Sequence, residues 1–241
     1  QLTVGFDLTL LHLAHRFGGN MSIECPDRAQ VVIIGGGVIG CSVAYHLAEL
    51  GWTDVVLVER KSLTSGTTWH AAGLVGQLRA TQNLTRMAQY TTDLYANLEN
   101  LTGQATGFRQ NGSLSLATDP ERFEELKRGA SMASCFGLEG EEITPEEALK
   151  LYPIMTTENL VGAVFLPRDG QTNPTDTTQA LARGARNKGV KILEKTQATR
   201  LEKNSGRVSA VVTDQGRIEC DFVVNCAGMW GRQVGEMAGV S

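Results

Sequence analysis

The 241-residue chain lacks any apolar run close to the roughly 18 residues that a bilayer crossing needs, so we expect no membrane span. It also lacks blocks of charge of one sign. Its 22 lysine and arginine residues are interspersed with 26 aspartate and glutamate residues, for a net charge of −4. We therefore expect no nucleic-acid partner, because such a partner requires clustered positive charge.

A C-x-x-C pair is also absent, and the number of cysteines is odd. Both facts argue against a disulfide framework and against a zinc site. The composition favours free, buried thiols in a reducing compartment, and we expect no metal site. The cysteines are Cys25, Cys41, Cys135, Cys220 and Cys226.

A glycine-rich turn follows the first apolar segment of the chain. Residues 31–34 form a short apolar run, typical of a parallel strand that is covered on both faces. Gly35, Gly37 and Gly40 follow in the G-x-G-x-x-G spacing. The first glycine permits a tight turn, the second lets a pyrophosphate approach the backbone, and the third lets the next helix press against the strand.

An amphipathic helix is predicted after this turn, with Gly51 as its C-terminal stop. Its apolar positions recur at steps of four and three, at Ile39, Val43, Leu47 and Leu50.

An acidic residue ends the second predicted strand. Glu59 follows residues 55–58 and lies nineteen positions after Gly40. A carboxylate at this place can accept hydrogen bonds from a ribose 2′-hydroxyl and repels a 2′-phosphate. The pattern indicates FAD or NAD and not NADP; the alternative is a glycine-rich turn in another α/β protein.

A second loop, SGTTWHAAGL at residues 65–74, is rich in small residues, so its backbone can come close to a ligand. With this motif the chain resembles the dimethylglycine and sarcosine dehydrogenase family of D-amino-acid-oxidase-like flavoproteins. In that family G-[ST]-T-W-H-x-A-G-L carries a histidine bonded covalently to the 8α-methyl of FAD, and His70 holds its position. The alternative is that His70 is a structural hydrogen-bonding residue.

The middle of the chain breaks the alternation of strands and helices. We predict an amphipathic helix over residues 83–101 whose core positions are Leu84, Met87, Thr91, Leu94, Leu98 and Leu101. Residues 103–117 alternate and contain a hairpin-like Asn111-Gly112 turn. Asp119-Pro120 and the capping box Thr144-Pro145-Glu146-Glu147 each begin a helix.

The last third of the chain again contains a helix and strands typical of an α/β domain. Residues 169–174 (DGQTNP) lead into a helix with Thr178, Leu181, Ala182 and Ala185 on one face, followed by four short strands. The last strand ends in an Ala227-Gly228 turn and a helix that begins near Trp230. In the resembled flavoproteins such a turn passes beside the dinucleotide, although Trp230 could equally be a core aromatic residue.

The resemblance implies an α/β fold: a Rossmann-like FAD-binding domain of the glutathione-reductase type with part of an inserted antiparallel substrate domain. We expect a leader or disordered extension at 1–28, FAD-binding parts at 29–105 and 169–241, and the substrate-domain part at 106–168. The predicted cofactor-binding residues are Gly35, Gly37, Val38, Ile39, Gly40, Glu59, Arg60, Gly66, Thr67, Thr68, Trp69, His70, Ala71, Ala72, Gly73, Leu74, Ala198 and Trp230.

The resemblance also implies a reaction. The substrate is an N-methylated glycine such as dimethylglycine or sarcosine, oxidised at a carbon next to the amine nitrogen. The product loses formaldehyde or passes its one-carbon unit to tetrahydrofolate in the full-length protein. An electron-transfer flavoprotein is the expected electron acceptor. The expected location is the mitochondrial matrix in a eukaryote and the cytoplasm otherwise.

The resemblance begins at Ala29 and covers only the front portion of the family's length. We therefore interpret the chain as a fragment, inactive alone, whose catalytic acid and base lie downstream of Ser241. Residues 1–28 either contain the tail of a transit peptide, or Met21 is the functional start and the residues before it are a gene-model artefact. The particular amine, the choice between dehydrogenase and oxidase, and the oligomeric state stay open.

Two other classes of function compete. One is an FAD- or NAD-binding oxidoreductase with another substrate. The other is a non-catalytic regulator, because the regulatory subunit of pyruvate dehydrogenase phosphatase is a similar protein. That subunit lacks the flavin-linking histidine, whereas His70 is present here.

Overall fold

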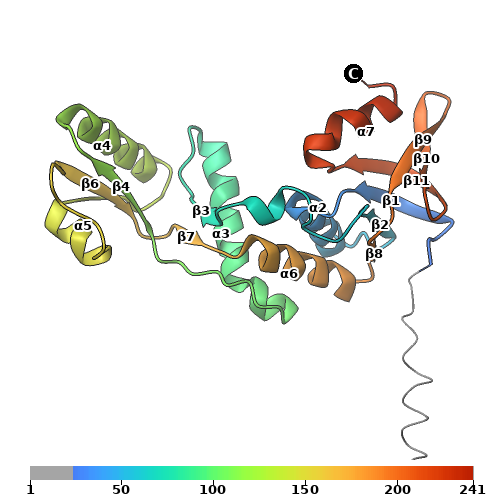
Figure 1. The fold of residues 1–241 in the computed structure, drawn as a ribbon, viewed down its shortest axis with the longest axis horizontal. Coiled ribbons are helices and arrows are strands. Elements are labelled where there is room, and N and C mark those ends of the chain that lie inside the picture. The colour runs from blue at the N-terminus through green and yellow to red at the C-terminus, as the bar shows by residue number, and fades with distance from the viewer. Residues whose placement is uncertain (1–23, 241) are drawn as a thin grey trace, which may run out of the picture.

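The computed structural model describes residues 24–240, so most of the predicted leader lies outside the described residues. The fold is α/β, as predicted, and its main sheet has six strands in the order β8-β2-β1-β11-β10-β9 (Figure 1). The first four are parallel, and β10 and β9 run antiparallel to their neighbours. The strands are β1 (Arg28–Ile34), β2 (Val55–Val58), β8 (Lys191–Leu193), β9 (Ala198–Asn204), β10 (Arg207–Thr213) and β11 (Arg217–Asn225).

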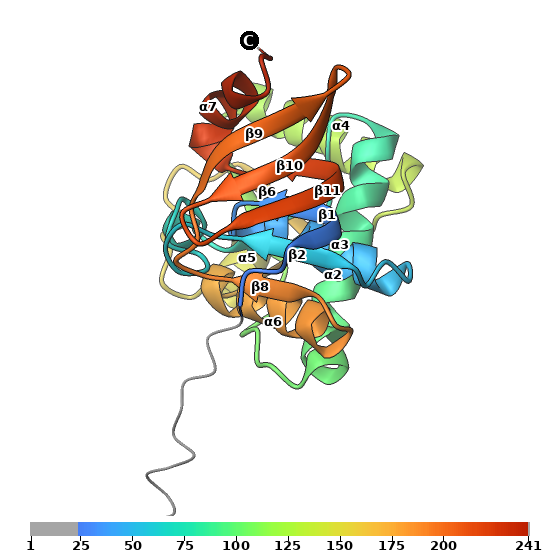
Figure 2. The ribbon, with the colours of Figure 1, turned by 90° about the vertical axis from the view of Figure 1, so that its right-hand side faces the viewer.

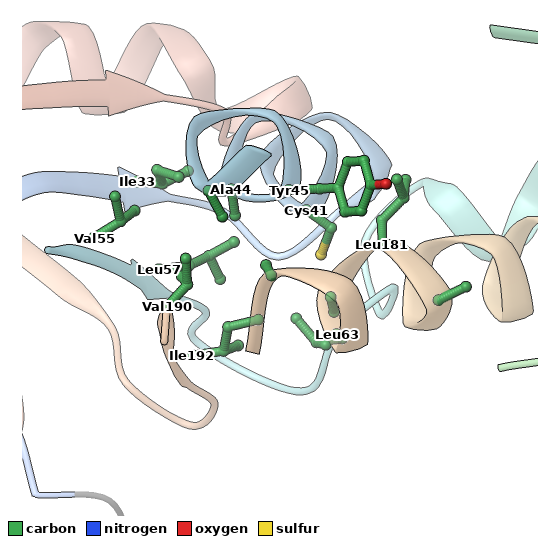
Figure 3. Close-up of a cluster of buried hydrophobic side chains, with 14 of the residues drawn as sticks. Ile33, Cys41, Ala44, Tyr45, Val55, Leu57, Leu63, Leu181, Val190 and Ile192 are labelled. Carbon is green, nitrogen blue, oxygen red and sulfur yellow. The ribbon is translucent and has the colours of Figure 1, made fainter. Parts of the chain in front are cut away.

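Strand β1 lies in the interior of this sheet and points its side chains into a hydrophobic cluster on each face. Val31 and Ile33 belong to one cluster, shown in Figure 3, and Val32 and Ile34 belong to the other. Both faces of the strand are therefore buried, which explains the unbroken apolar run.

Helices α2 (Val38–Glu49) and α6 (Pro174–Asn187) pack together over the first cluster (Figures 1 and 3). The predicted face of α6 is confirmed, because its four residues are buried. The predicted face of α2 is only partly right: Val43 and Leu47 pack against the first cluster, but Ile39 is 64% and Leu50 76% exposed. The buried face consists of Gly40, Cys41, Ala44, Tyr45 and Ala48.

The reason for this difference is the close approach of the two helices. A Cβ on Gly184 of α6 would lie 2.6 Å from a ring carbon of Tyr45, so the missing side chain makes room for the aromatic ring. Close packing thus selects a stripe of small residues together with Tyr45, whose ring fits against Gly184, over the stripe of large aliphatic residues. The predicted stop of α2 is confirmed, since Gly51 has φ +88°.

On the opposite face, side chains of the parallel strands pack with residues of β9 and β10 and of helix α7 (Gly231–Met237), which is visible at the top of Figure 2. Leu201, Val211 and Val234 from these elements join the second hydrophobic cluster. This arrangement brings α7 to the same side as the end of β1, where the glycine turn begins.

A second sheet is separate from the first and has three antiparallel strands in the order β4-β6-β5 (Figure 1). The predicted Asn111-Gly112 hairpin is wrong, because β4 pairs with the distant β6. The Gly112 N–H instead donates to the carbonyl oxygen of Asp169 at 2.8 Å. The strands are β4 (Ser113–Ala117), β5 (Glu141–Ile143) and β6 (Gly162–Leu166).

Two capped helices accompany this sheet, as predicted. Helix α4 (Pro120–Cys135) begins after Asp119, whose carboxylate accepts the Arg122 N–H at 2.7 Å. Helix α5 (Pro145–Leu151) begins with the predicted capping box. The Asp119-Pro120 pair and the capping box therefore predicted the starts of both helices correctly.

Helix α3 (Gln82–Thr102) forms where predicted, and its predicted core face is confirmed only in part: Leu98 is buried and Leu94 packs against the first cluster. Three predicted core residues are at least half exposed: Leu84, Met87 and Leu101. Three threonines are buried instead: Thr85, Thr92 and Thr102. Each hydroxyl donates to the carbonyl oxygen four residues earlier, so these polar side chains can be buried at little cost.

The two sheets are joined where three segments meet, residues 73–77, 106–113 and 169–173, which we name the crossing. In Figure 1 its short strands β3 (Leu74–Val75) and β7 (Gly170–Gln171) lie between the two sheets. Arg109 and Gln171 exchange backbone hydrogen bonds of 2.8 and 2.9 Å. The crossing therefore fixes the loop after His70 relative to both sheets.

All five cysteines are free, but the prediction of buried thiols is wrong for Cys135, which is exposed. Cys135 is the last residue of α4 and lies on the side away from the buried Ala133. Cys41 and Cys220 are buried, and Cys25 and Cys226 are half-buried. Within residues 24–240, no helix combines the length and apolar character of a membrane span.

Candidate functional site

The glycine turn between β1 and α2 passes against the end of β11. Gly35 has φ +114°, and a Cβ on it would lie 2.4 Å from the carbonyl oxygen of Cys226. A Cβ on Gly40 would lie 1.9 Å from the carbonyl oxygen of Gly35. Both positions therefore require glycine, and the first turn of α2 packs directly on the turn before it.

Gly37 caps α2 without a side chain, so the start of the helix stays open. The Val38 N–H donates to the Thr68 hydroxyl at 3.0 Å, and a Cβ on Gly37 would lie 3.1 Å from the same oxygen. Thr68 thus ties the loop of the second motif to the glycine turn. Further N–H groups in a first helical turn have no partner within the helix, which makes this end attractive to an anion.

Glu59 at the end of β2 holds its carboxylate beside the turn. One oxygen accepts the Gly36 N–H at 2.7 Å, and the other accepts the Lys61 N–H at 2.8 Å. A carboxylate has about four acceptor positions, so two hydrogen bonds orient it without saturating it. Free acceptor positions are what a ribose hydroxyl needs.

A cavity of about 220 Å³ lies at the carboxyl ends of β1, β2 and β11. Arg60 covers one side, with its guanidinium carbon 3.9 Å from the centroid of the Trp230 ring. The predicted residues that line this cavity are Gly35, Gly37, Glu59, Arg60, Gly66, Thr67, Thr68, Ala198 and Trp230. The predicted residues outside its lining are Val38, Ile39, Gly40, Trp69, His70, Ala71, Ala72, Gly73 and Leu74.

Several lining residues were not among the predicted site residues. Helix α7 presents Gln233, Val234 and Met237; it follows the predicted turn, but none of these three was among the predicted site residues. Two further lining residues, Thr196 and Gln197, immediately precede the predicted Ala198. Two more, Ala227 and Gly228, form the turn that was predicted to pass beside the dinucleotide. The remaining lining residues are Ile34, Gly36, Val58, Lys61, Ser65 and Cys226.

His70 is the last residue of the short helix η1 (Thr68–His70) and is exposed. Its ring stacks on Trp69, with the centroids 3.8 Å apart and the planes inclined by 33°. Thr68 lines the first cavity, whereas Trp69 lines a second, open one of about 540 Å³ with Gly107 and residues 171–175. His70 thus follows two residues that face different cavities.

Burial disfavours the thiolate form of the two cysteines near the turn. Burial raises the pKa of Cys41 to about 12 and also raises the pKa of Cys226. A protonated thiol is a poor nucleophile, so neither residue suits covalent chemistry. Among residues 24–240, no three histidine, cysteine, aspartate or glutamate side chains are grouped to hold a metal ion.

Comparison with known proteins decides the family of this chain. The family of FAD-dependent oxidoreductases named DAO matches residues 30–241. The chain belongs to this family. Its resemblance to sarcosine and dimethylglycine dehydrogenases is also confirmed.

Mitochondrial sarcosine dehydrogenase of Mus musculus is 42% identical over 221 residues, which cover 89% of this chain and 24% of that protein. The mitochondrial regulatory subunit of pyruvate dehydrogenase phosphatase of Mus musculus is 41% identical over 214 residues, with the same coverage. The crystal structure of L-proline dehydrogenase from P. horikoshii has a TM-score of 0.85 at 29% identity, covering 90% of this chain and 57% of that one. This DAO chain spans about a quarter of the length of the two Mus musculus relatives.

Proposed function

We propose that this chain binds FAD and that the protein containing it oxidises a small N-methylated amino acid such as dimethylglycine or sarcosine. The observation that carries the proposal is the cavity at the ends of β1, β2 and β11, which combines the glycine turn with Glu59. Membership of the FAD-dependent oxidoreductases and 42% identity to a sarcosine dehydrogenase support it.

The residues of the cavity fit the adenosine diphosphate part of FAD. The glycine turn leaves room for two phosphates beside the open start of α2, where N–H groups and the helix dipole favour negative charge. The Glu59 carboxylate would accept hydrogen bonds from the ribose hydroxyls. Arg60, Ala198 and Trp230 would enclose the adenine end.

His70 would hold the flavin covalently. It is exposed and follows directly on Thr68 and Trp69, so its ring is accessible to a ligand that extends beyond the first cavity. Forming the link joins a ring nitrogen to the 8α-methyl carbon, releases one proton from each, and leaves two electrons for the electron acceptor to remove. A neutral imidazole is a competent nucleophile for such a step.

Bound FAD supplies a hydride acceptor for a carbon next to an amine nitrogen. The chain's own residues would position that acceptor through the glycine turn, Glu59 and His70. For the full-length protein we further propose an electron-transfer flavoprotein as acceptor, tetrahydrofolate as carrier of the one-carbon unit, and a mitochondrial matrix location in a eukaryote.

We also propose that residues 29–105 and 169–241 are two parts of one FAD-binding domain and that residues 106–168 belong to a substrate domain. The six-stranded sheet takes its strands from the two outer segments, and the second sheet takes all three from the middle segment. This division agrees with the separate sheets of Figure 1.

The decisive experiment follows the flavin after denaturation of the full-length protein. We expect yellow fluorescence to stay with the wild-type polypeptide on a denaturing gel after acid treatment. His70→Ala should abolish this retention completely. His46→Gln is the matched control, since His46 lies on α2 outside the cavity and contacts Ser42 and Tyr90. Retention in His70→Ala would refute the assignment of His70.

The same gel separates the other candidate functions. Flavin that leaves the wild-type protein on denaturation would favour an oxidoreductase with a dissociable cofactor and another substrate. A protein that contains no flavin would favour a regulator, which the 41% identity to the pyruvate dehydrogenase phosphatase subunit keeps as the second candidate. A series of methylated glycines with an artificial electron acceptor would then identify the substrate.

A further inference from the structure

A buried carboxylate lies at the centre of the crossing and has no part in the cavity. Asp169 is only 5% exposed, and both of its side-chain oxygens are used. One accepts the Gln77 N–H at 2.8 Å, and the other accepts the Ser113 hydroxyl at 2.7 Å. A single side chain thus joins the start of β4 to the segment that follows His70.

The backbone around Asp169 holds the same two segments. Its carbonyl oxygen accepts the Gly112 N–H at 2.8 Å, and the Thr172 N–H donates to the carbonyl oxygen of Gly73 at 2.8 Å. Gly73 has φ +77°, and a Cβ there would lie 2.1 Å from the Thr172 oxygen. The segment 73–77 is therefore clamped within a few residues of His70.

Gln77 adds a second attachment to this clamp. Its side-chain nitrogen donates to the carbonyl oxygen of Arg168 at 2.6 Å, and the residue is 1% exposed. Its backbone and its side chain are therefore both bonded to the dipeptide Arg168-Asp169. Buried hydrogen bonds of this kind hold a segment rigidly, because leaving either partner unpaired in the interior is costly.

We propose that Asp169 is a positioning residue: its carboxylate, bonded to Gln77 and Ser113, fixes residues 73–77, which follow His70 closely, so that the imidazole reaches the flavin. This inference rests on the proposed function of His70. Displacement of reacting atoms by about 1 Å can slow a reaction about a hundredfold, so a loosened clamp should act on the rate of the covalent link.

The test uses the full-length protein, produced without flavin and then mixed with FAD. The measured rate is the appearance of acid-stable flavin on the polypeptide. Asp169→Leu should slow it by about tenfold to a hundredfold. Ser113→Ala, which removes one of the two side-chain bonds and leaves the carboxylate in place, should slow it by a smaller factor.

Asp169→Asn should restore most of the rate. Its amide oxygen can accept the Gln77 N–H, and its amide nitrogen can donate to the Ser113 hydroxyl, which then acts as acceptor. The matched control is Asp93→Leu, which removes a carboxylate bonded to Arg168 at 2.8 Å in an exposed ion pair. We expect no change of rate in this control.

Hydrogen exchange in the flavin-free protein provides a readout that is independent of the cofactor. Asp169→Leu should speed the exchange of amides in residues 73–77, and Asp169→Asn should leave it nearly unchanged. A wild-type rate of link formation in Asp169→Leu would overturn the inference. If Asp169→Leu does not fold, a wild-type rate in Ser113→Ala would overturn it.

The two proposals fail differently. If the wild-type protein forms no covalent link, the function of His70 is wrong, and exchange of residues 73–77 alone decides whether Asp169 fixes the segment. Unchanged exchange in Asp169→Leu would then overturn the inference, and faster exchange would support it.

Discussion

At the scale of single residues, two helical glycines in this protein have opposite surroundings. A Cβ on Gly40 would lie 1.9 Å from a backbone oxygen that cannot move without breaking the glycine turn, whereas a Cβ on Gly129 in α4 would meet no atom within 4 Å. The same substitution should therefore have opposite effects on stability at the two positions.

Gly40→Ala should lower the free energy of unfolding by about 1–3 kcal/mol, the usual cost of overpacking. Gly129→Ala should raise it by about 0.5–1 kcal/mol, because alanine loses less backbone entropy than glycine when a helix forms. Urea unfolding of both variants, followed by circular dichroism, measures the difference. Equal effects would show that the close contact at Gly40 is relieved by movement of α2.

At the scale of elements, the capping box of α5 predicts a pH effect. The Glu147 carboxylate accepts the Thr144 N–H at 2.8 Å, and the Thr144 hydroxyl accepts the Glu147 N–H at 3.2 Å. The backbone hydrogen bond from Thr144 is the largest cause that lowers the pKa of Glu147 in the folded protein. A lowered folded pKa means that the charged carboxylate stabilises the helix above its unfolded pKa and that this contribution is lost as the pH falls through the folded value.

We therefore expect the amide protection of α5 to fall when the pH is lowered from about 6 to about 3, after correction for intrinsic exchange. Hydrogen exchange with mass spectrometry measures it. Glu147→Gln is the control, because glutamine can serve in the same box without titrating in this range. A pH dependence that persists in Glu147→Gln would assign the effect to another group.

At the scale of the whole molecule, the cavity takes its residues from the turn after β1, the loops after β2 and β8, and the region from the end of β11 through α7. The second sheet contributes none of its lining residues. A ligand in the cavity should therefore stabilise the part of the molecule built on the six-stranded sheet more than the part built on the second sheet. At a hundredfold excess over its dissociation constant, such a ligand raises the free energy of unfolding of the part that binds it by about 2.7 kcal/mol.

FAD should thus slow amide exchange in residues 34–41, 58–70 and 226–237 and leave residues 113–117 and 162–166 unchanged. Hydrogen exchange with and without FAD measures this pattern. Flavin mononucleotide, which lacks the adenosine part, is the matched ligand control and should protect these segments less. Equal protection of both sheets by FAD would contradict the proposed place of binding.

Several features were predictable from the sequence because they depend on residues within a few positions of one another. Gly35 and Gly51 have the positive φ that their turns require, and Asp119 and Thr144 cap the helices that follow them. The succession of strand, helix and strand at the start of the main sheet was predictable from two apolar runs, one before the glycine turn and one after the helix that follows it. In all these cases the signal and its effect lie in the same short segment.

The sequence by itself determined the turn, the caps, the fold class and the motif around His70. Only the tertiary structure decided which faces of α2 and α3 are buried, that β4 pairs with β6, and that α7 joins the cavity wall. It also brought Asp169 to Gln77 and Ser113. These outcomes depend on close packing and hydrogen bonds between segments far apart in the chain, and no local pattern of residues encodes them.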